Sequence, residues 1–289
     1  MQPAAHNPIL RTRDVRRRFD RAAGNFDEFD FVHRVTRDGL LERLQPMLVD
    51  ATTVLDLGCA TGAAYRPLRQ RFPRARIIGI DLSSGMLQRA ARRRSWLSKY
   101  ALLQADATAL PLADHSIDVV FCNQLLPWVA DPAALFAEVG RVLRADGLLV
   151  FAALGPDSLG QLRLAWQAAD NGAHVNAFPD MHNLGDAAVR AGLRDPVLDV
   201  DRLGVSYADA GAMFRDLAGS GARNCLAARR PSLTGRGRFQ RMLAALQAAR
   251  ADRAIELELE LIYGHCWGCG PRARDGEFRV PLDGIGRRS

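Results

Sequence analysis

The stretch TTVLDLGCATG, residues 52–62, decides the fold of this chain of 289 residues. It begins as a short apolar run, which is typical of a buried β-strand. It ends in small residues, among them Gly58 and Gly62, which let the backbone turn tightly and come close to a ligand. A buried strand that stops in such a turn is typical of the ligand-binding edge of an open α/β sheet.

The residues that follow alternate between predicted strands and predicted helices. Apolar runs predict strands over residues 76–81, 100–104, 117–123 and 147–154. Helical spacing of apolar residues predicts helices over residues 33–48, 63–72, 84–94 and 131–144. Near-continuous apolar strands that alternate with helices indicate a Rossmann-like α/β fold, in which a mostly parallel sheet has helices on both faces.

The second half of the chain has a less regular pattern. We expect helices over residues 157–170, 182–192 and much of 208–250, and a short strand over 197–201. The stretch IELELELIYG, residues 255–264, alternates apolar and charged side chains, which predicts a half-exposed antiparallel strand. The predicted organisation is a helical N-terminal segment (1–50), a Rossmann-like core (51–205), a helical lid inserted before the last strand (206–252), and that strand with a glycine-rich tail (253–289).

Composition excludes several classes of protein. Hydrophobic residues make up 48% and charged residues 25% of the chain, which is ordinary for a globular protein, and no run is long enough to span a membrane. The net charge of +7 permits an acidic partner. The five cysteines are too few and scattered for a disulfide scaffold, and they favour a reducing compartment. The five arginines within residues 11–18 could suggest a mitochondrial transit peptide. Because Asp14 and Asp20 interrupt this basic segment, we expect a cytoplasmic protein.

Acidic residues stand where three of the predicted strands end. Asp56 belongs to the first strand, Asp81 ends the second, and Asp106 follows the third. A dinucleotide fingerprint laid from Gly58 would need glycine at positions 60 and 63, where the chain has alanine, and no phosphate-binding P-loop follows. A carboxylate at the end of the second strand can instead accept hydrogen bonds from both hydroxyls of a ribose.

This arrangement resembles the Rossmann-like methyltransferases that use S-adenosylmethionine. DLGCATG (56–62) is similar to their first motif, and Asn123-Gln124 to the motif after their fourth strand. The resemblance implies a cofactor-binding set of Asp56, Gly58, Ala60, Gly62, Asp81, Met86, Asp106, Ala107 and Asn123. Within it, Asp81 would bind the ribose, Asp106 the adenine amino group, and Met86 would pack on the ring. Alanine replaces a glycine at position 60, which is tolerable where φ is negative and otherwise weakens binding.

Residues 16–268 resemble a narrower family, the malonyl-acyl-carrier-protein O-methyltransferases of biotin precursor synthesis. The similar segments are RRRFDRAAGNFDEF and its continuation (16–44), and those spanning 110–170, 174–201, 219–239 and 255–268. The resemblance implies methyl transfer from S-adenosylmethionine to the free carboxylate of a malonyl thioester on an acidic acyl carrier protein or on coenzyme A. It implies no nucleic-acid or membrane partner. Because a carboxylate with a pKa of roughly 4 is already ionised at neutral pH, we expect no general base.

The same resemblance implies residues for the substrate. Arg229 in CLAARRP would grip the substrate carboxylate, with Arg223 and Arg230 as alternatives, and the 208–250 region would exclude water as a lid. Trp128 either walls the pocket or belongs to the core. Phe26 stands where the family usually has tyrosine, whose hydroxyl would reach the cofactor carboxylate.

Some questions stay open at the level of sequence. Related methyltransferase-fold proteins assist assembly of respiratory complex I and modify a protein arginine, and Ala60 and Phe26 also allow a non-catalytic interaction protein. Cys266 and Cys269 form a C-x-x-C without a second pair, so we expect incidental cysteines and no metal site. His174 and His182 are expected to orient loops. The oligomeric state and the preference for carrier protein or coenzyme A are not decided.

Overall fold

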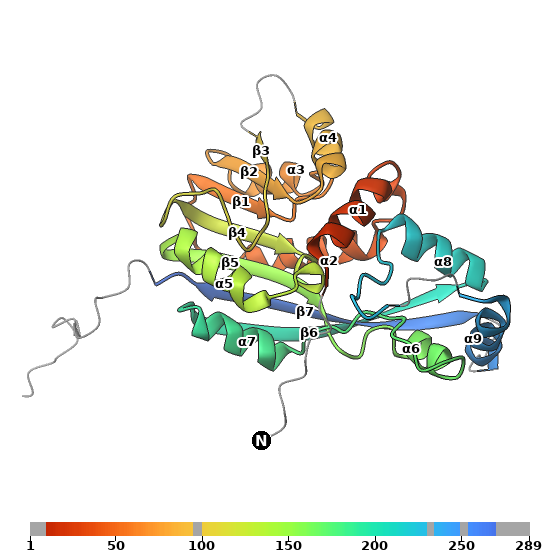
Figure 1. Cartoon of the computed structure of the whole chain (residues 1–289). Coiled ribbons are helices and arrows are strands. Elements are labelled where there is room, and N and C mark those ends of the chain that lie inside the picture. Colours follow the sequence, from red (N-terminus) through yellow and green to blue (C-terminus); the bar gives the residue numbers. More distant parts are fainter. Residues whose placement is uncertain (1–9, 95–99, 230–233, 249–253, 270–289) are drawn as a thin grey trace, which may run out of the picture.

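The computed structural model describes residues 10–94, 100–229, 234–248 and 254–269. Within them lies a seven-stranded sheet of order β3-β2-β1-β4-β5-β7-β6 (Figure 1). Its strands are β1 Thr53–Leu57, β2 Arg76–Asp81, β3 Tyr100–Gln104, β4 Ile117–Asn123, β5 Leu143–Leu154, β6 Arg194–Tyr207 and β7 Ile255–Trp267. Strands β1 to β5 pair in parallel, whereas β7 is antiparallel to both β5 and β6. The mostly parallel sheet and the antiparallel last strand are thus confirmed.

Helices cover both faces of this sheet. They are α1 Thr12–Ala22, α2 Phe31–Leu44, α3 Tyr65–Arg71, α4 Ser84–Arg92, α5 Pro132–Val142, α6 Gly160–Gln167, α7 Met181–Arg190, α8 Ala210–Gly219 and α9 Arg236–Ala248, with short 3₁₀ helices η1 Phe26–Glu28 and η2 Leu126–Trp128. Neighbouring residues of β4 enter different apolar clusters: Phe121 packs with α2 and α3, and Val120 with α5 and α7. The buried strands need this cover because both of their faces are apolar.

Two long strands differ from their predictions. β6 has 14 residues instead of the expected five, because it pairs with β7 along most of its length while its charged side chains remain exposed at the sheet edge. β7 is half-exposed only in its first part. Residues 261–264 are buried, since here the strand lies between β5 and β6.

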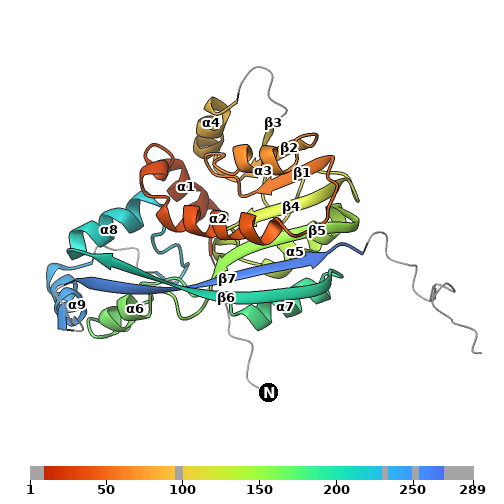
Figure 2. The same cartoon turned by 180° about the vertical axis from the view of Figure 1, so that it is seen from behind.

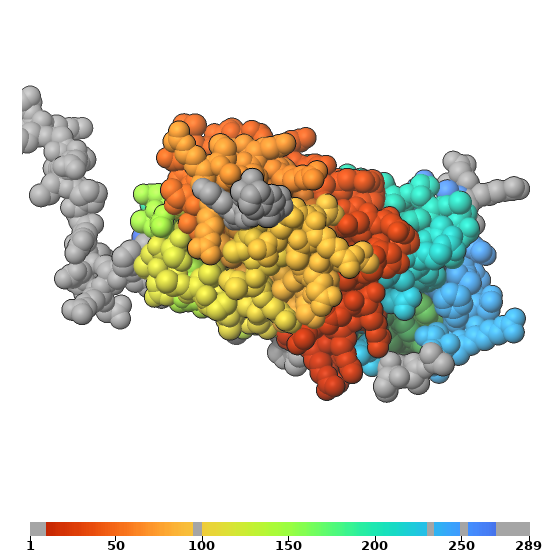
Figure 3. Space-filling view, turned by 90° about the horizontal axis from the view of Figure 1, so that it is seen from above, coloured from red at the N-terminus to blue at the C-terminus, as the bar shows by residue number. Residues whose placement is uncertain are grey.

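The paired strands β6 and β7 extend beyond the parallel part of the sheet. Helices α6, α8 and α9 gather at this far end, and α1 and α2 lie between them and the parallel core (Figures 1 and 2). Seen from above, α1 and α2 fill the space between the core and α8 (Figure 3). At the end of α8, Gly219 packs so closely on Phe29 that a Cβ would lie 2.1 Å from the ring. The N-terminal helices are therefore part of the walls around the site.

Candidate active site

The turn after β1 is built from three residues in the left-handed region. φ is +75° at Gly58, +46° at Ala60 and +76° at Gly62. A Cβ on Gly58 would lie 3.0 Å from the Cβ of Leu125, so glycine also makes room there. Ala60 does not meet the condition of a negative φ, and its methyl group strains a turn that a third glycine would relieve.

Asp81 joins this turn to the beginning of α4. Its Oδ2 accepts a hydrogen bond from the backbone N–H of Ala60 at 2.9 Å, and its Oδ1 accepts one from Ser83 at 2.8 Å. The carboxyl lines a cavity, and burial raises its pKa to about 6. Asp81 thus presents acceptor oxygens at the end of β2, where the sequence places the ribose acid.

Two polar side chains near this turn have buried atoms without a hydrogen-bond partner among the described residues. Asp56 is 2% exposed and leaves Oδ2 unpaired, and burial together with the charge of Asp81 raises its pKa to about 7. Asn123 at the end of β4 donates from Nδ2 to the carbonyl of His33 at 2.9 Å but leaves Oδ1 unpaired. Asn123 lines the cavity, and an unpaired buried acceptor there fits a ligand that brings hydrogen-bond donors.

The cavity has a volume of about 330 Å³ and lies at the carboxyl ends of β1, β2 and β4. From the predicted cofactor-binding set, five residues line it: Gly58, Ala60, Asp81, Asp106 and Asn123. The other four, Asp56, Gly62, Met86 and Ala107, are not among its lining residues. Met86 is fully buried and packs in a cluster with Ala60 and Phe26, and its contact with the adenine ring stays a prediction.

Helix α1 covers this cavity, which the sequence patterns do not reveal. Thr12, Val15, Arg16 and Phe19 line it from α1. Asp20 fixes the helix, because its Oδ1 accepts hydrogen bonds from the Ser83 hydroxyl at 2.7 Å and from the Gly85 N–H at 3.0 Å. The signal that could have found this contact is an acid inside an arginine-rich helix that precedes the core.

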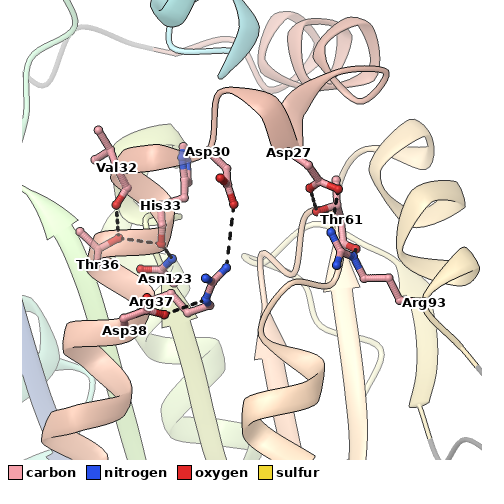
Figure 4. A network of polar contacts seen from close by, with 10 residues as sticks. All are labelled: Asp27, Asp30, Val32, His33, Thr36, Arg37, Asp38, Thr61, Arg93 and Asn123. Atoms are coloured by element: carbon pink, nitrogen blue, oxygen red, sulfur yellow. Dashed lines mark hydrogen bonds and ion pairs between the residues drawn. The ribbon is translucent and has the colours of Figure 1, made fainter.

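A set of polar contacts holds η1 against the turn after β1 (Figure 4). The Thr61 hydroxyl donates to Asp27 Oδ1 at 2.5 Å, and Arg93 donates to Asp27 Oδ2 at 2.7 Å. These contacts also fix the position of Phe26 in η1. It is buried, lines the cavity, and packs edge-on against the His33 ring at a centroid distance of 5.0 Å. Position 26 therefore faces the cavity in which the resemblance to the methyltransferases places the cofactor.

A second and larger cavity adjoins the first. It has a volume of about 690 Å³ and lies over the far end of β6 and β7, between α2 and the helices α6, α8 and α9. Its walls are mainly apolar and include Phe29, Trp166, Phe178, Phe214 and Phe239. Three residues line both cavities: His33, Gln124 and Trp128. The two cavities thus meet at one shared wall.

Comparison with known proteins places the chain in a family. A family described as "Methyltransferase domain" matches residues 55–151. A malonyl-[acyl-carrier protein] O-methyltransferase of Laribacter hongkongensis is 42% identical, with 90% of either chain covered. That of Halorhodospira halophila is 40% identical over 100% of this chain and 99% of its own. The chain belongs to the malonyl-[acyl-carrier protein] O-methyltransferase family.

Solved structures agree on the fold of this family member. The YcgJ protein of Bacillus subtilis superposes with a TM-score of 0.58 at 17% identity, covering 81% of this chain and 100% of its own. A SAM-dependent methyltransferase of Thermotoga maritima gives a TM-score of 0.52 at 18% identity, with 88% and 99% covered. At these identities the likeness supports the class I methyltransferase fold alone.

The family's substrate arginine was predicted at Arg229, which the structure places outside the lining of both cavities. Its guanidinium donates to Asp14 Oδ2 at 2.8 Å and so ties α1 to the segment after α8. Its role at the substrate stays a prediction. Arg223, an alternative, is exposed and lines the second cavity, whereas Arg230 lies outside the described residues. Trp128 lines both cavities, as expected of a pocket wall.

The remaining motif residues lie apart from the shared wall. His174 lines the second cavity, is 2.7 Å from Asp170 Oδ1 and stacks on Trp166 at a centroid distance of 3.9 Å, whereas His182 is exposed on α7. Cys266 is buried in β7, and Cys269 is exposed. Among the described residues, no group of three or more His, Cys, Asp or Glu could hold a metal ion. In the same residues, the helices are all too short or too polar to cross a membrane.

Proposed function

We propose that this chain transfers the methyl group of S-adenosylmethionine to the free carboxylate of a malonyl thioester carried by acyl carrier protein. The observation that carries the proposal is the pair of cavities with one shared wall. One cavity presents acids and a tight glycine turn, which suits a nucleoside, and the other is apolar and suits an acyl group. The named relatives, matched over nearly their whole length, favour this reaction over modification of a protein arginine.

The residues of the first cavity fit S-adenosylmethionine, which supplies a methyl group activated on a positively charged sulfur. Asp81 would accept from the ribose hydroxyls, and Asp106 from the adenine amino group. The backbone at Gly58 and Ala60 would lie along the amino-acid portion, and Asn123 Oδ1 offers an unpaired buried acceptor. The two acids also complement the positive charge of the ligand.

The work of the protein is placement and exclusion of water. The carboxylate is ionised at neutral pH, so no proton has to be removed before it attacks. Alignment of the carboxylate with the methyl group, at the place where the two cavities meet, supplies the rate enhancement. Phe19 of α1 packs edge-on against Trp128 at a centroid distance of 5.1 Å, which covers this wall with aromatic rings and keeps the reacting groups dry.

Surface charge supports an acidic carrier protein as the partner. Helix α1 exposes Arg13, Arg16 and Arg17, and Arg11 is exposed just before it. A β-bridge between Leu10 and Leu226 brings the start of this helix next to the segment that carries Arg223. Arg223 lines the second cavity and Arg16 the first, so this arginine-rich surface lies beside the site and would attract an acidic protein.

The proposal is tested by mass spectrometry of the carrier. The protein is incubated with S-adenosylmethionine and malonyl-acyl carrier protein, in parallel with malonyl-coenzyme A and with the acetyl carrier as control. A mass gain of one methyl group on the malonyl carrier alone is expected, and release of methanol on alkaline treatment identifies it as a methyl ester. No gain on the malonyl carrier, while the protein binds S-adenosylmethionine, would contradict the proposal.

A further inference from the structure

The wall shared by the two cavities contains an unusual glutamine. Gln124 directly follows β4, is only 4% exposed and lines both cavities. Its Nε2 has no hydrogen-bond partner among the described residues. A buried amide that is left without an acceptor requires an explanation, since such groups are nearly always paired. An acceptor supplied by a ligand at the wall would explain it.

The backbone holds Gln124 in a conformation that favours glycine. Its φ is +56°, and its N–H donates to the carbonyl of Ala152 on β5 at 2.8 Å. A long side chain in the left-handed region is strained, and strain of this kind concentrates at functional sites. The neighbouring turn uses glycine at Gly58 and Gly62 for the same backbone geometry, whereas position 124 keeps a side chain that reaches the wall.

His33 contributes a second neutral polar group to the same wall. Its Nδ1 is buried and unpaired, and Asn123 fixes its backbone carbonyl from β4. Burial and the nearby Arg37 lower the pKa of the imidazole to about 4, so the ring is uncharged at neutral pH. The three residues common to both cavities, His33, Gln124 and Trp128, therefore offer N–H groups without a positive charge.

We propose that the Gln124 amide donates to the attacking carboxylate of the substrate and that the His33 ring completes its binding site; this inference rests on the proposed function. The carboxylate oxygen forms a bond to the methyl carbon as the carbon–sulfur bond breaks, its electron pair stays on sulfur, and no proton is transferred. The carboxylate loses its charge in this step. A neutral donor orients it with less stabilisation of the ground state than a guanidinium would give.

Two variants separate the amide from the backbone geometry. Gln124→Leu keeps the size of the side chain, and Gln124→Gly suits the left-handed backbone, but both remove the donor. We expect kcat/KM for malonyl-acyl carrier protein to fall by about 10- to 100-fold in both, with the Kd for S-adenosylhomocysteine within about 2-fold of the wild type. Gln167→Leu on the exposed surface of α6 is the control. Full activity of Gln124→Gly would overturn the proposal, because only the backbone would then matter.

A reversal of polarity tests the contact directly. Gln124→Glu replaces the donor with a carboxylate, so it should reject the malonyl group and bind its carbamoyl analogue, in which an amide NH₂ replaces the acid. Isothermal titration with S-adenosylhomocysteine present measures both ligands on both proteins. An unchanged preference for the acid in Gln124→Glu contradicts the inference. If the wild type transfers methyl and the Gln124 variants match it, only this inference fails; if the wild type transfers none, the proposed function fails first and the inference with it.

Discussion

The side-chain Nδ2 of Asn123 donates to the carbonyl oxygen of His33 at 2.9 Å, which joins the end of β4 to the first turn of α2. The Thr36 hydroxyl donates to the same carbonyl at 3.2 Å (Figure 4). Residues from the parallel core and from the N-terminal segment are thus held together where the two cavities meet. The position of His33 depends on a contact 90 residues away in the chain.

Removal of this contact should loosen the wall. We expect Asn123→Ala to lower the free energy of unfolding by about 1–2 kcal/mol, because the buried carbonyl loses a partner. Methyl transfer should fall as well, since His33 is no longer fixed. Urea denaturation and kcat/KM measure the two effects, and Asn183→Ala on the exposed start of α7 is the control. A stable variant with normal methyl transfer would show that the contact does not position His33.

Asp81→Ala should abolish binding of the cofactor while the fold survives. The substitution removes the acceptors that face the cavity and leaves backbone N–H groups, among them those of Ala60 and Ser83, without their partner. Isothermal titration with S-adenosylhomocysteine measures affinity, and circular dichroism measures the fold. Asp81→Asn keeps acceptor oxygen and should retain weak binding. An affinity equal to that of the wild type in Asp81→Ala would remove Asp81 from the cofactor site.

Ala60→Gly should stabilise the turn after β1. The φ of +46° is unfavourable for alanine and neutral for glycine, so we expect a gain of up to about 1 kcal/mol and equal or tighter cofactor binding. Ala63→Gly, three residues later and not in the left-handed region, should instead lose about 0.5–1 kcal/mol. Thermal unfolding compares the two. Loss of stability in both variants would contradict the strain at position 60.

Local sequence patterns predict the parallel core well. β2, β3 and β4 begin and end where the apolar runs over 76–81, 100–104 and 117–123 do. Most residues of β2 and β4 are buried, which explains their apolar runs, whereas β3 lies at the sheet edge and only its Tyr100 is buried. Helix starts are equally clear where a cap is local: the Ser83 hydroxyl accepts from Met86 N–H, and Asp131 caps the helix that begins at Pro132. The acids at the strand ends follow from the same patterns.

What the sequence does not reveal depends on contacts between distant segments. The length of β6 comes from its pairing with β7, and its charged residues hide it from a search for apolar runs. The second cavity is enclosed by α2 (Phe31–Leu44) together with α6, α8 and α9, which lie between Gly160 and Ala248, far along the chain. Gln124 is adjacent to a predicted strand end, yet only the packed structure shows that its amide is buried and unpaired.

Asp56 should make the ligand-free protein less stable as pH rises. Its pKa of about 7 in the folded protein lies above the usual value of 3.8 for an aspartate, so its contribution to stability is fully present below about pH 4 and is lost as pH rises through 7. Asp56→Asn removes this titration. The free energy of unfolding of the variant, relative to that of the wild type, should therefore be about 1–3 kcal/mol higher at pH 8 than at pH 5. Denaturation at both pH values measures the gain, with Asp186→Asn on the exposed face of α7 as the control. An equal gain at both pH values would exclude an ionising Asp56.

Charge reversal on α1 should weaken use of a carrier-bound substrate specifically. The double variant Arg13→Glu/Arg17→Glu places acids on the exposed face of α1, beside the segment that bears Arg223. We expect KM for malonyl-acyl carrier protein to rise by about 10-fold at low salt, because an acidic partner is repelled, and the difference to shrink at high salt. The malonyl thioester of N-acetylcysteamine, which carries no protein, should keep its KM. Arg66→Glu/Arg74→Glu, a double reversal at two other exposed positions, is the matched control. If both thioesters are affected equally, α1 acts through the cofactor cavity that it covers and not through the carrier.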